Sequence, residues 1–427
     1  MKNLKYLFFL LLLLVLEPMF AQFTVDAQIR PRFEYRHGYK SPFPDNADPA
    51  TFVSQRTRLN FGYQSELLHF YLSAQDVRVW GEVSGSTPIN NDGITVHEAW
   101  GEILFSPQLF LKIGRQEIAY DDERMMGSSD WGQQARSHDV ALLKLRPSLS
   151  FKVHLGVAYN QDKEALTGNL LTDNNYKSFQ YLWFHKDWEK WNTSFLFLNN
   201  GLQYIDELDP SQNSTRYSQT AGFHIGSQLS KINLSSNLYY QFGKDLANNN
   251  INAYLFSVQG NYAASEKIKL GLGGEILSGN DYGTPKDGKN HSFNPIYGTN
   301  HKFNGLMDYF YAGNHTDNVG LIDIFGSANY SFNSKSGIIL NFHKFFAASE
   351  IDSDISKDLG FEIDLVTSYS LNKFVGIKAG YSRFFTSEGT EIIKNNYDGN
   401  RNDWAWIMIS INPVLFKWQA AESTNNL

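Results

Sequence analysis

Four arginines near the start of the chain are the strongest candidates for binding chemistry. They form two pairs with one residue between the members of each pair: Arg30, Arg32, Arg56 and Arg58. Guanidinium groups bind planar carboxylates through two parallel hydrogen bonds. Because like charges on neighbouring strands repel each other, such a cluster needs carboxylate partners or a function. Two interpretations are open, namely a basic site for an anionic solute and an internal salt-bridge network with Asp26, Glu34 or Asp76.

Other groups of reactive residues are weaker candidates. Ser137, His138 and Asp139 are consecutive, and neighbours on a strand point to opposite faces, so they cannot form a catalytic triad. Glu362 and Asp364 share a face as a glycosidase pair would, but an ordinary polar strand face explains them better. The spacing of His291, His301 and His315 resembles no metal motif, and a solvated acidic loop is the simpler reading of Asp352 and Asp354. The chain has no cysteine, which excludes disulfides and thiolate chemistry. We therefore predict no enzyme activity, no metal and no cofactor.

Strands must position the four arginines. From Phe23 to Arg36 apolar and polar residues alternate almost without interruption, and this period of two is typical of a strand between two different environments. The same alternation recurs in residues 151–159, 232–242, 268–275, 360–365 and 404–411. Folding the first two strands about the loop near Pro42 to Asp45 brings the four arginines to a similar height on one face.

The connections between strands alternate short and long. Short gaps occur at residues 64–66, 106–108, 147–149, 264–266, 333–336 and 371–373, and long gaps at 38–50, 82–93, 121–136, 161–175, 279–317 and 387–401. This asymmetry predicts an all-β, up-and-down antiparallel transmembrane β-barrel of about 18 strands, with short periplasmic turns and long extracellular loops. A barrel of that width leaves a water channel, which favours transport. The alternative is a soluble β-rich protein such as a lectin-like sandwich.

Composition agrees with one large barrel. The mean hydropathy of −0.37 is too polar for a bundle of membrane helices, and aromatic residues make up 15% of the 427 residues. The net charge of −7 does not suggest a nucleic-acid partner. Residues 1–21 read as a signal peptide, with Lys2 and Lys5 before the apolar run from Tyr6 to Leu16. Residues 22–418 are the predicted barrel and 419–427 a polar tail.

Two segments of the chain resemble a known family. The first runs from Leu111 through Gly114-Arg115-Gln116 to Asp139, and the second from Gly298 to Gly313. With the arginine-rich start, they resemble the alginate export family of outer-membrane proteins over nearly the whole mature chain. The chain departs from that pattern in its polar residues 420–427, which replace an aromatic C-terminal residue, with Phe416 and Trp418 near the strand end instead.

The resemblance implies an 18-stranded barrel with an arginine-rich constriction that conducts a polyuronate. The candidates for the constriction are the four arginines and then three more: Arg115, Arg124 and Arg136. The expected partners are outer-membrane lipid, an anionic polysaccharide or oligosaccharide, and periplasmic secretion components. Any driving force would come from partners or from gradients.

The long segment 279–317 is expected to fold into the lumen as a plug or gate. Its aromatic residues are costly to leave in water, and the candidate gating residues are His301, Phe303, Asp308 and Tyr309. The alternative is a large surface loop packed on itself. The favoured function is a channel for anionic polysaccharide in either direction, and the main alternative is a general or small-anion porin. An adhesin with a plugged lumen is also open, and a barrel enzyme is disfavoured because no catalytic set is found.

Overall fold

The computed structural model describes residues 21–82, 93–284, 288–310, 319–396, 399 and 401–420. Nearly all of the predicted leader and most of the predicted polar tail lie outside these residues, as does His315. Among the described residues, no helix combines the length and the apolar character that a bilayer crossing requires.

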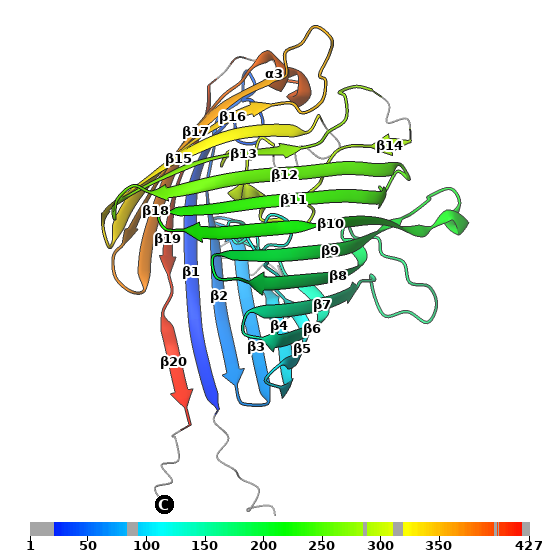
Figure 1. Cartoon of the computed structure of the whole chain (residues 1–427), viewed down its shortest axis with the longest axis vertical. Coiled ribbons are helices and arrows are strands. Elements are labelled where there is room, and N and C mark those ends of the chain that lie inside the picture. Colours follow the sequence, from blue (N-terminus) through cyan, green and yellow to red (C-terminus); the bar gives the residue numbers. More distant parts are fainter. Residues whose placement is uncertain are drawn as a thin grey trace, which may run out of the picture.

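The chain forms a closed antiparallel barrel of 18 strands, as the alternating connections predicted. Figure 1 labels 20 strands. Of these, β14 is a two-residue piece of a loop, and β19 and β20 together form the last strand of the barrel. The first half comprises β1 (Gln22–His37), β2 (Ala50–Gln64), β3 (Leu68–Val79), β4 (Ile94–Ser106), β5 (Leu109–Gln116), β6 (His138–Ser148), β7 (Phe151–Tyr159), β8 (Tyr176–Asp187) and β9 (Trp191–Tyr204). The second half comprises β10 (Ser214–Leu229), β11 (Ile232–Lys244), β12 (Asn250–Ala263), β13 (Ile268–Leu277), β14 (Lys289–Asn290), β15 (Leu321–Asn333), β16 (Ser336–Phe346), β17 (Asp358–Ser370), β18 (Val375–Phe385), β19 (Asn402–Ile411) and β20 (Val414–Gln419). The helical pieces are η1 (Pro210–Gln212), η2 (Asn300–Lys302) and α3 (Glu388–Lys394).

The first and last strands pair with each other and close the barrel. β1 pairs with β2 along its whole length and with β19 and β20 on its other edge. This last strand is interrupted at Pro413, because proline has no N–H to donate to the ladder. β20 then continues the pairing with β1, with Phe416 opposite Val25 and Trp418 opposite Phe23. The start of β1 and the end of β20 lie at the same end of the barrel as the short β2–β3 turn (Figure 1).

The two faces of β1 are as predicted. Ile29 and Phe33 are exposed, whereas Arg30, Arg32 and Glu34 are buried. The outward face of the barrel is therefore apolar and suited to lipid, and the charged face points into the lumen.

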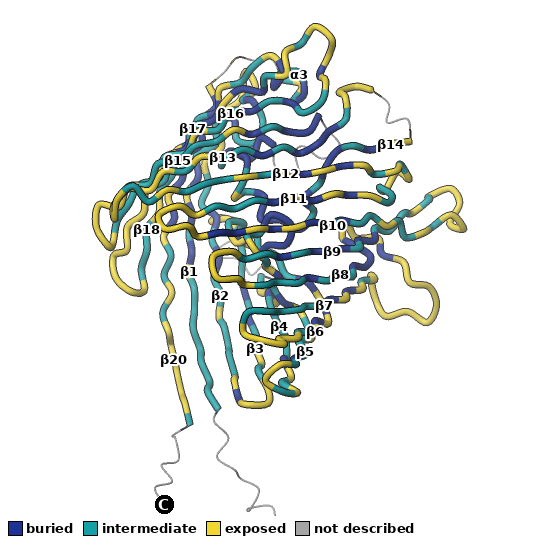
Figure 2. Tube along the Cα trace, in the orientation of Figure 1, coloured by how far each residue is buried: buried dark blue, intermediate teal, exposed yellow. Residues whose placement is uncertain are grey.

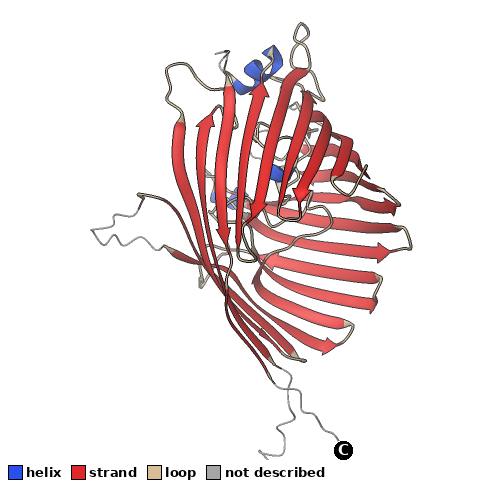
Figure 3. Cartoon of the chain, turned by 90° about the vertical axis from the view of Figure 1, so that its left-hand side faces the viewer, coloured by secondary structure: helices blue, strands red, loops and turns tan. Residues whose placement is uncertain are grey.

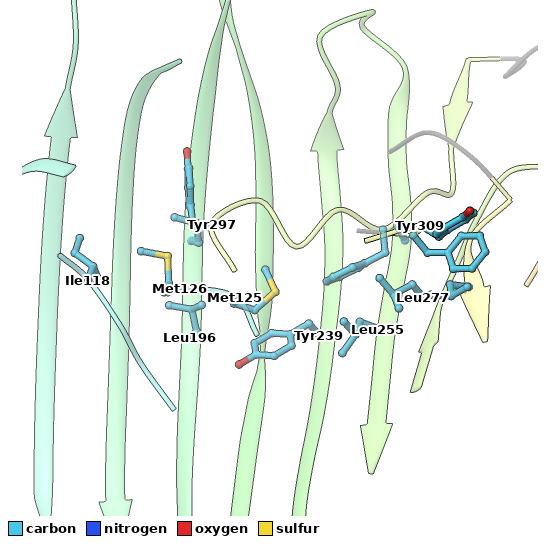
Figure 4. Close-up of a cluster of buried hydrophobic side chains, with 14 of the residues drawn as sticks. Ile118, Met125, Met126, Leu196, Tyr239, Leu255, Leu277, Tyr297 and Tyr309 are labelled. Carbon is cyan, nitrogen blue, oxygen red and sulfur yellow. The ribbon is translucent and has the colours of Figure 1, made fainter. Parts of the chain in front are cut away.

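Two loops fill the lumen in the half of the barrel away from the short turns. One is the β5–β6 loop (residues 117–137), and the other is the described part of the β13–β15 loop (residues 278–284 and 288–310). Figure 3 shows them between the walls of strands, and Figure 2 shows that buried residues gather in that half. Figure 4 shows loop side chains packed on strand side chains; it labels Ile118, Met125, Met126, Tyr297 and Tyr309 of the loops and Leu196, Tyr239, Leu255 and Leu277 of the strands.

The packing of these loops changes the expected character of the lumen. Over β8 to β19 large apolar side chains lie on the inward face beside polar ones. Leu198, Leu255, Phe345 and Trp404 are fully buried there, and so are Glu362 and Asp364. Period-two patterns predicted a polar, water-filled interior. The structure has, in addition to polar inward residues, a hydrophobic cluster inside the barrel where the loops pack on the strands.

Candidate functional site

Arg30, Arg56 and Arg58 form a cluster on the inner wall at β1 and β2. In the antiparallel register Arg30 lies directly opposite Arg56, and Arg58 lies opposite Gln28. Their side chains are only 5%, 1% and 11% exposed. Folding the two strands about their common loop thus brings three of the four predicted arginines together at one height.

A carboxylate from the β5–β6 loop occupies this cluster. Asp130 Oδ2 lies 3.0 Å from Nη1 of Arg30, its Oδ1 lies 2.8 Å from Nη1 of Arg56, and Nη1 of Arg58 is 4.0 Å from Oδ1. Burial alone would raise the pKa of Asp130, but the hydrogen bond and charge of Arg56, followed by the charges of Arg30 and Arg58, lower it below its usual value. Asp130 is therefore ionised at neutral pH, and its carboxylate is bound to the arginine cluster as a solute carboxylate would be.

Arg32 has a different environment from the other three. Its Nε donates to Oε1 of Glu34 at 2.9 Å, and Glu34 also accepts from Arg36 and from the indole of Trp404. The Arg32 guanidinium stacks 4.1 Å above the ring of Trp131 and donates to the Trp131 carbonyl. Of the predicted salt-bridge partners, Glu34 pairs with Arg32, whereas Asp76 pairs with Arg78 and Asp26 accepts from Asn60.

A cavity of about 640 Å³ opens beside Arg32, a size typical of small-molecule sites. Its charged and aromatic lining comes from β1 to β3, the loops that follow β1 and β3, and both inward loops: Arg32, Glu34, Arg36, Tyr39, Lys40, Phe52, Arg78, Glu82, Trp131, Arg136, His301 and Asp308. Basic groups outnumber carboxylates in this lining, and Trp131 stacks on His301 with ring centres 4.5 Å apart. Guanidinium groups in such a lining suit an anionic solute.

Arg124 fastens both inward loops to the wall. It is 1% exposed and forms a two-point ion pair with Glu275 of β13, with Nε to Oε2 at 2.8 Å. It also donates to Asn300 and Asn304 of the β13–β15 loop. These contacts join both loops to the wall, so the structure places Arg124, predicted as a constriction residue, as a structural clamp.

The β13–β15 loop contacts the wall through several of the predicted gating residues. His301 Nδ1 lies 2.8 Å from Asp308 Oδ1, and Asp308 accepts the hydroxyl of Tyr39, whose pKa is raised by burial and then by that carboxylate. Tyr309 is fully buried and stacks on Phe384 at 3.9 Å. Phe303 lies under the Arg124 guanidinium and lines a second cavity of about 220 Å³.

Gly305 permits the closest approach of this loop to the wall. Its φ is +83°, and a Cβ at this position would lie 2.6 to 2.8 Å from the Glu362 carboxylate, which accepts the Met307 N–H. We expect Gly305→Ala to lower the free energy of unfolding by about 1–3 kcal/mol, from backbone strain and the clash. The measurement is thermal unfolding in detergent. Gly283→Ala is the matched control, because Gly283 also has positive φ but open space around it; equal losses in both variants would contradict the prediction.

Arg115 and Arg136 lie apart from the cluster. Arg115 is 45% exposed, 3.8 Å from Asp139, on the side of β5 opposite to the buried Gln116. The structure thus places this predicted constriction residue on the outward face. Arg136 donates to the carbonyl of Gly298 and lines the larger cavity, so it faces the lumen without joining Arg30 and Arg56.

Sequence reasoning missed the residues that complete the site. Asp130 and Gln133 are about 100 positions from Arg30. They lie inside the first segment that carries the family resemblance, but neither was predicted as a site residue. Electrostatics predicted that a carboxylate partner exists, because the clustered arginines would otherwise repel one another. Proximity in sequence then pointed to Asp26, Glu34 and Asp76 instead of the distant loop.

Comparison with known proteins agrees with this architecture. The alginate export family model matches residues 21–403. The chain belongs to the alginate export family. No curated protein sequence matches it.

Solved structures share the fold of this family member at low identity. Pseudomonas aeruginosa OpdL has a TM-score of 0.62 at 12% identity, covering 92% of this chain and 99% of that one. Acinetobacter baumannii OccAB4 has 0.61 at 11%, covering 93% and 98%. P. aeruginosa OpdK, solved with vanillate, has 0.58 at 13%, covering 93% and 99%. Family and fold together identify an outer-membrane β-barrel channel.

Proposed function

We propose that this channel passes an anionic polysaccharide of the alginate type, or its oligomers, along the arginine wall of β1 and β2. The observation that supports this most directly is the occupied cluster, in which the buried guanidiniums of Arg30 and Arg56 and the part-buried one of Arg58 converge on one carboxylate that is 52% exposed. A polyuronate carries about one such carboxylate per sugar. The wall can therefore exchange its partner for one on a passing chain, provided that each contact stays weak.

The cavity beside the cluster supports a saccharide in preference to an inorganic ion. The cavity of about 640 Å³ has room for a sugar ring, and its basic side chains can bind the carboxylates. Within the residues described, the wall facing this cavity is basic on β1, whereas the carboxylates of Glu275 and Asp323 lie on β13 and β15 and are held by Arg124 and His343.

A small-anion porin is the second candidate. The similar OpdK structure contains vanillate, a small carboxylate, and a cluster that binds one carboxylate does not require a chain of them. If this function is correct, acetate or vanillate should bind the arginine cluster with the same affinity per carboxylate as a uronate oligomer.

Single-channel conductance of the refolded mature chain in planar bilayers distinguishes the two. We expect oligoalginate to block the current at concentrations at which a neutral oligosaccharide of the same length does not. The multivalent contact should also make an octamer at least tenfold more potent per molecule than the monomeric uronate. Equal potency of monomer and octamer would favour the small-anion porin, and indifference to both would reject an anion-binding pore.

A further inference from the structure

The geometry points to Asp130 as a tethered internal ligand of the Arg30–Arg56–Arg58 cluster, which an anionic solute must displace in order to bind. This inference rests on the proposed function and deepens it, because it assigns the regulation of that site to one carboxylate.

The cluster keeps its shape without Asp130. Arg56 Nε donates to Gln28 Oε1 at 2.8 Å, and Arg58 Nε donates to Gln75 Oε1 at 2.8 Å. Both glutamines are on the barrel wall. The Arg56 and Arg58 guanidiniums are thus held in place by strand residues, and a carboxylate that binds them meets a preorganised site.

The loop also keeps its position without the Asp130 side chain. Gln133 accepts from Arg30 Nε and donates to the Arg30 carbonyl and to Ser54. Arg30 Nη2 donates to the backbone carbonyls of Asp130 and Gly132. With the Arg124–Glu275 clamp at its other end, the loop has anchors that do not involve the carboxylate.

Asp130 is much more exposed than the arginines it pairs with, as the replacement of Asp130 by a solute carboxylate requires. The Asp130 side chain is 52% exposed, against 5% and 1% for Arg30 and Arg56. The carboxylate is therefore the accessible member of the pair. A ligand on a short tether has an effective concentration of about millimolar, so it competes with free carboxylates and keeps their binding weak enough for release.

Asp130→Asn tests this directly. In planar bilayers we expect about tenfold tighter block by oligoalginate, with longer blocked times, and a reversal potential shifted towards chloride in a KCl gradient. Asp139→Asn is the matched control, because it removes the same charge from a carboxylate that is 56% exposed and paired with Arg115 at 3.8 Å. Asp130→Glu should restore parent behaviour, since it returns a carboxylate to the loop. Folding is verified by heat-dependent mobility in gels.

The two readouts separate this inference from the proposed function. If Asp130→Asn shifts the reversal potential but oligoalginate blocks neither protein, Asp130 is confirmed as the internal ligand and the polyuronate substrate is rejected. If oligoalginate blocks the parent and Asp130→Asn behaves as Asp139→Asn does in both readouts, the internal ligand is rejected and the substrate stands. Weaker block in Asp130→Asn would also overturn the inference, because it would make Asp130 part of the solute site.

Discussion

Glutamine in place of Arg30, Arg56 and Arg58 together is expected to weaken block by oligoalginate about 100-fold. Charge-assisted hydrogen bonds contribute about 1.5–3 kcal/mol each. Losing two of them at the cluster amounts to about 3 kcal/mol, and each 1.4 kcal/mol is tenfold in affinity. The variant should also lose its preference for anions, because Asp130 would remain without its three cations. The measurement is concentration-dependent block together with the reversal potential.

The control for this triple variant removes the same charge elsewhere. Arg115, Arg216 and Arg401 lie outside the cluster, and Arg401 is 77% exposed. Glutamine at these three positions should leave block within about twofold of the parent, since exposed charges are screened by salt. If the two triple variants weaken block equally, net charge and not the cluster determines binding.

Arg124→Met is expected to have the largest effect on stability. It leaves Glu275, 3% exposed, without its cation, and breaking one side of a buried ion pair costs about 3–5 kcal/mol. It also removes the contacts from Arg124 to Asn300 and Asn304 that join the two inward loops. We therefore expect a lower unfolding temperature and a larger, noisier single-channel current, because the β5–β6 loop would lose its ion pair to β13.

Two further variants separate loss of the pair from loss of charge. Arg115→Met removes an exposed arginine and should change neither property. Arg124→Met combined with Glu275→Met removes both charges, and replacing a buried pair by apolar groups is often neutral or stabilising. The double variant should recover stability while keeping the larger current, if the clamp holds the loops. Recovery of both would mean that the uncompensated charge alone disturbed the single variant.

The sequence by itself determined the barrel and one wall of its site. Alternation with period two is a local property of each strand, so the faces of Ile29, Arg30 and Phe33 followed from neighbouring residues alone. The position of the loop between β1 and β2 predicted that the arginines lie at a similar height, and the structure then gave the register, with Arg30 opposite Arg56. The number of strands followed from connection lengths.

Only the tertiary structure decided what fills the lumen. In β9 the run Phe195, Leu196, Phe197, Leu198 is apolar on both faces, and no local pattern shows that Leu196 and Leu198 pack on inward loops instead of lipid. Asp130 meets Arg56 across 74 positions and Arg124 meets Glu275 across 151. Such pairings are set by where a long loop enters the barrel, and loop entry depends on the packing of the whole interior, which no single segment encodes.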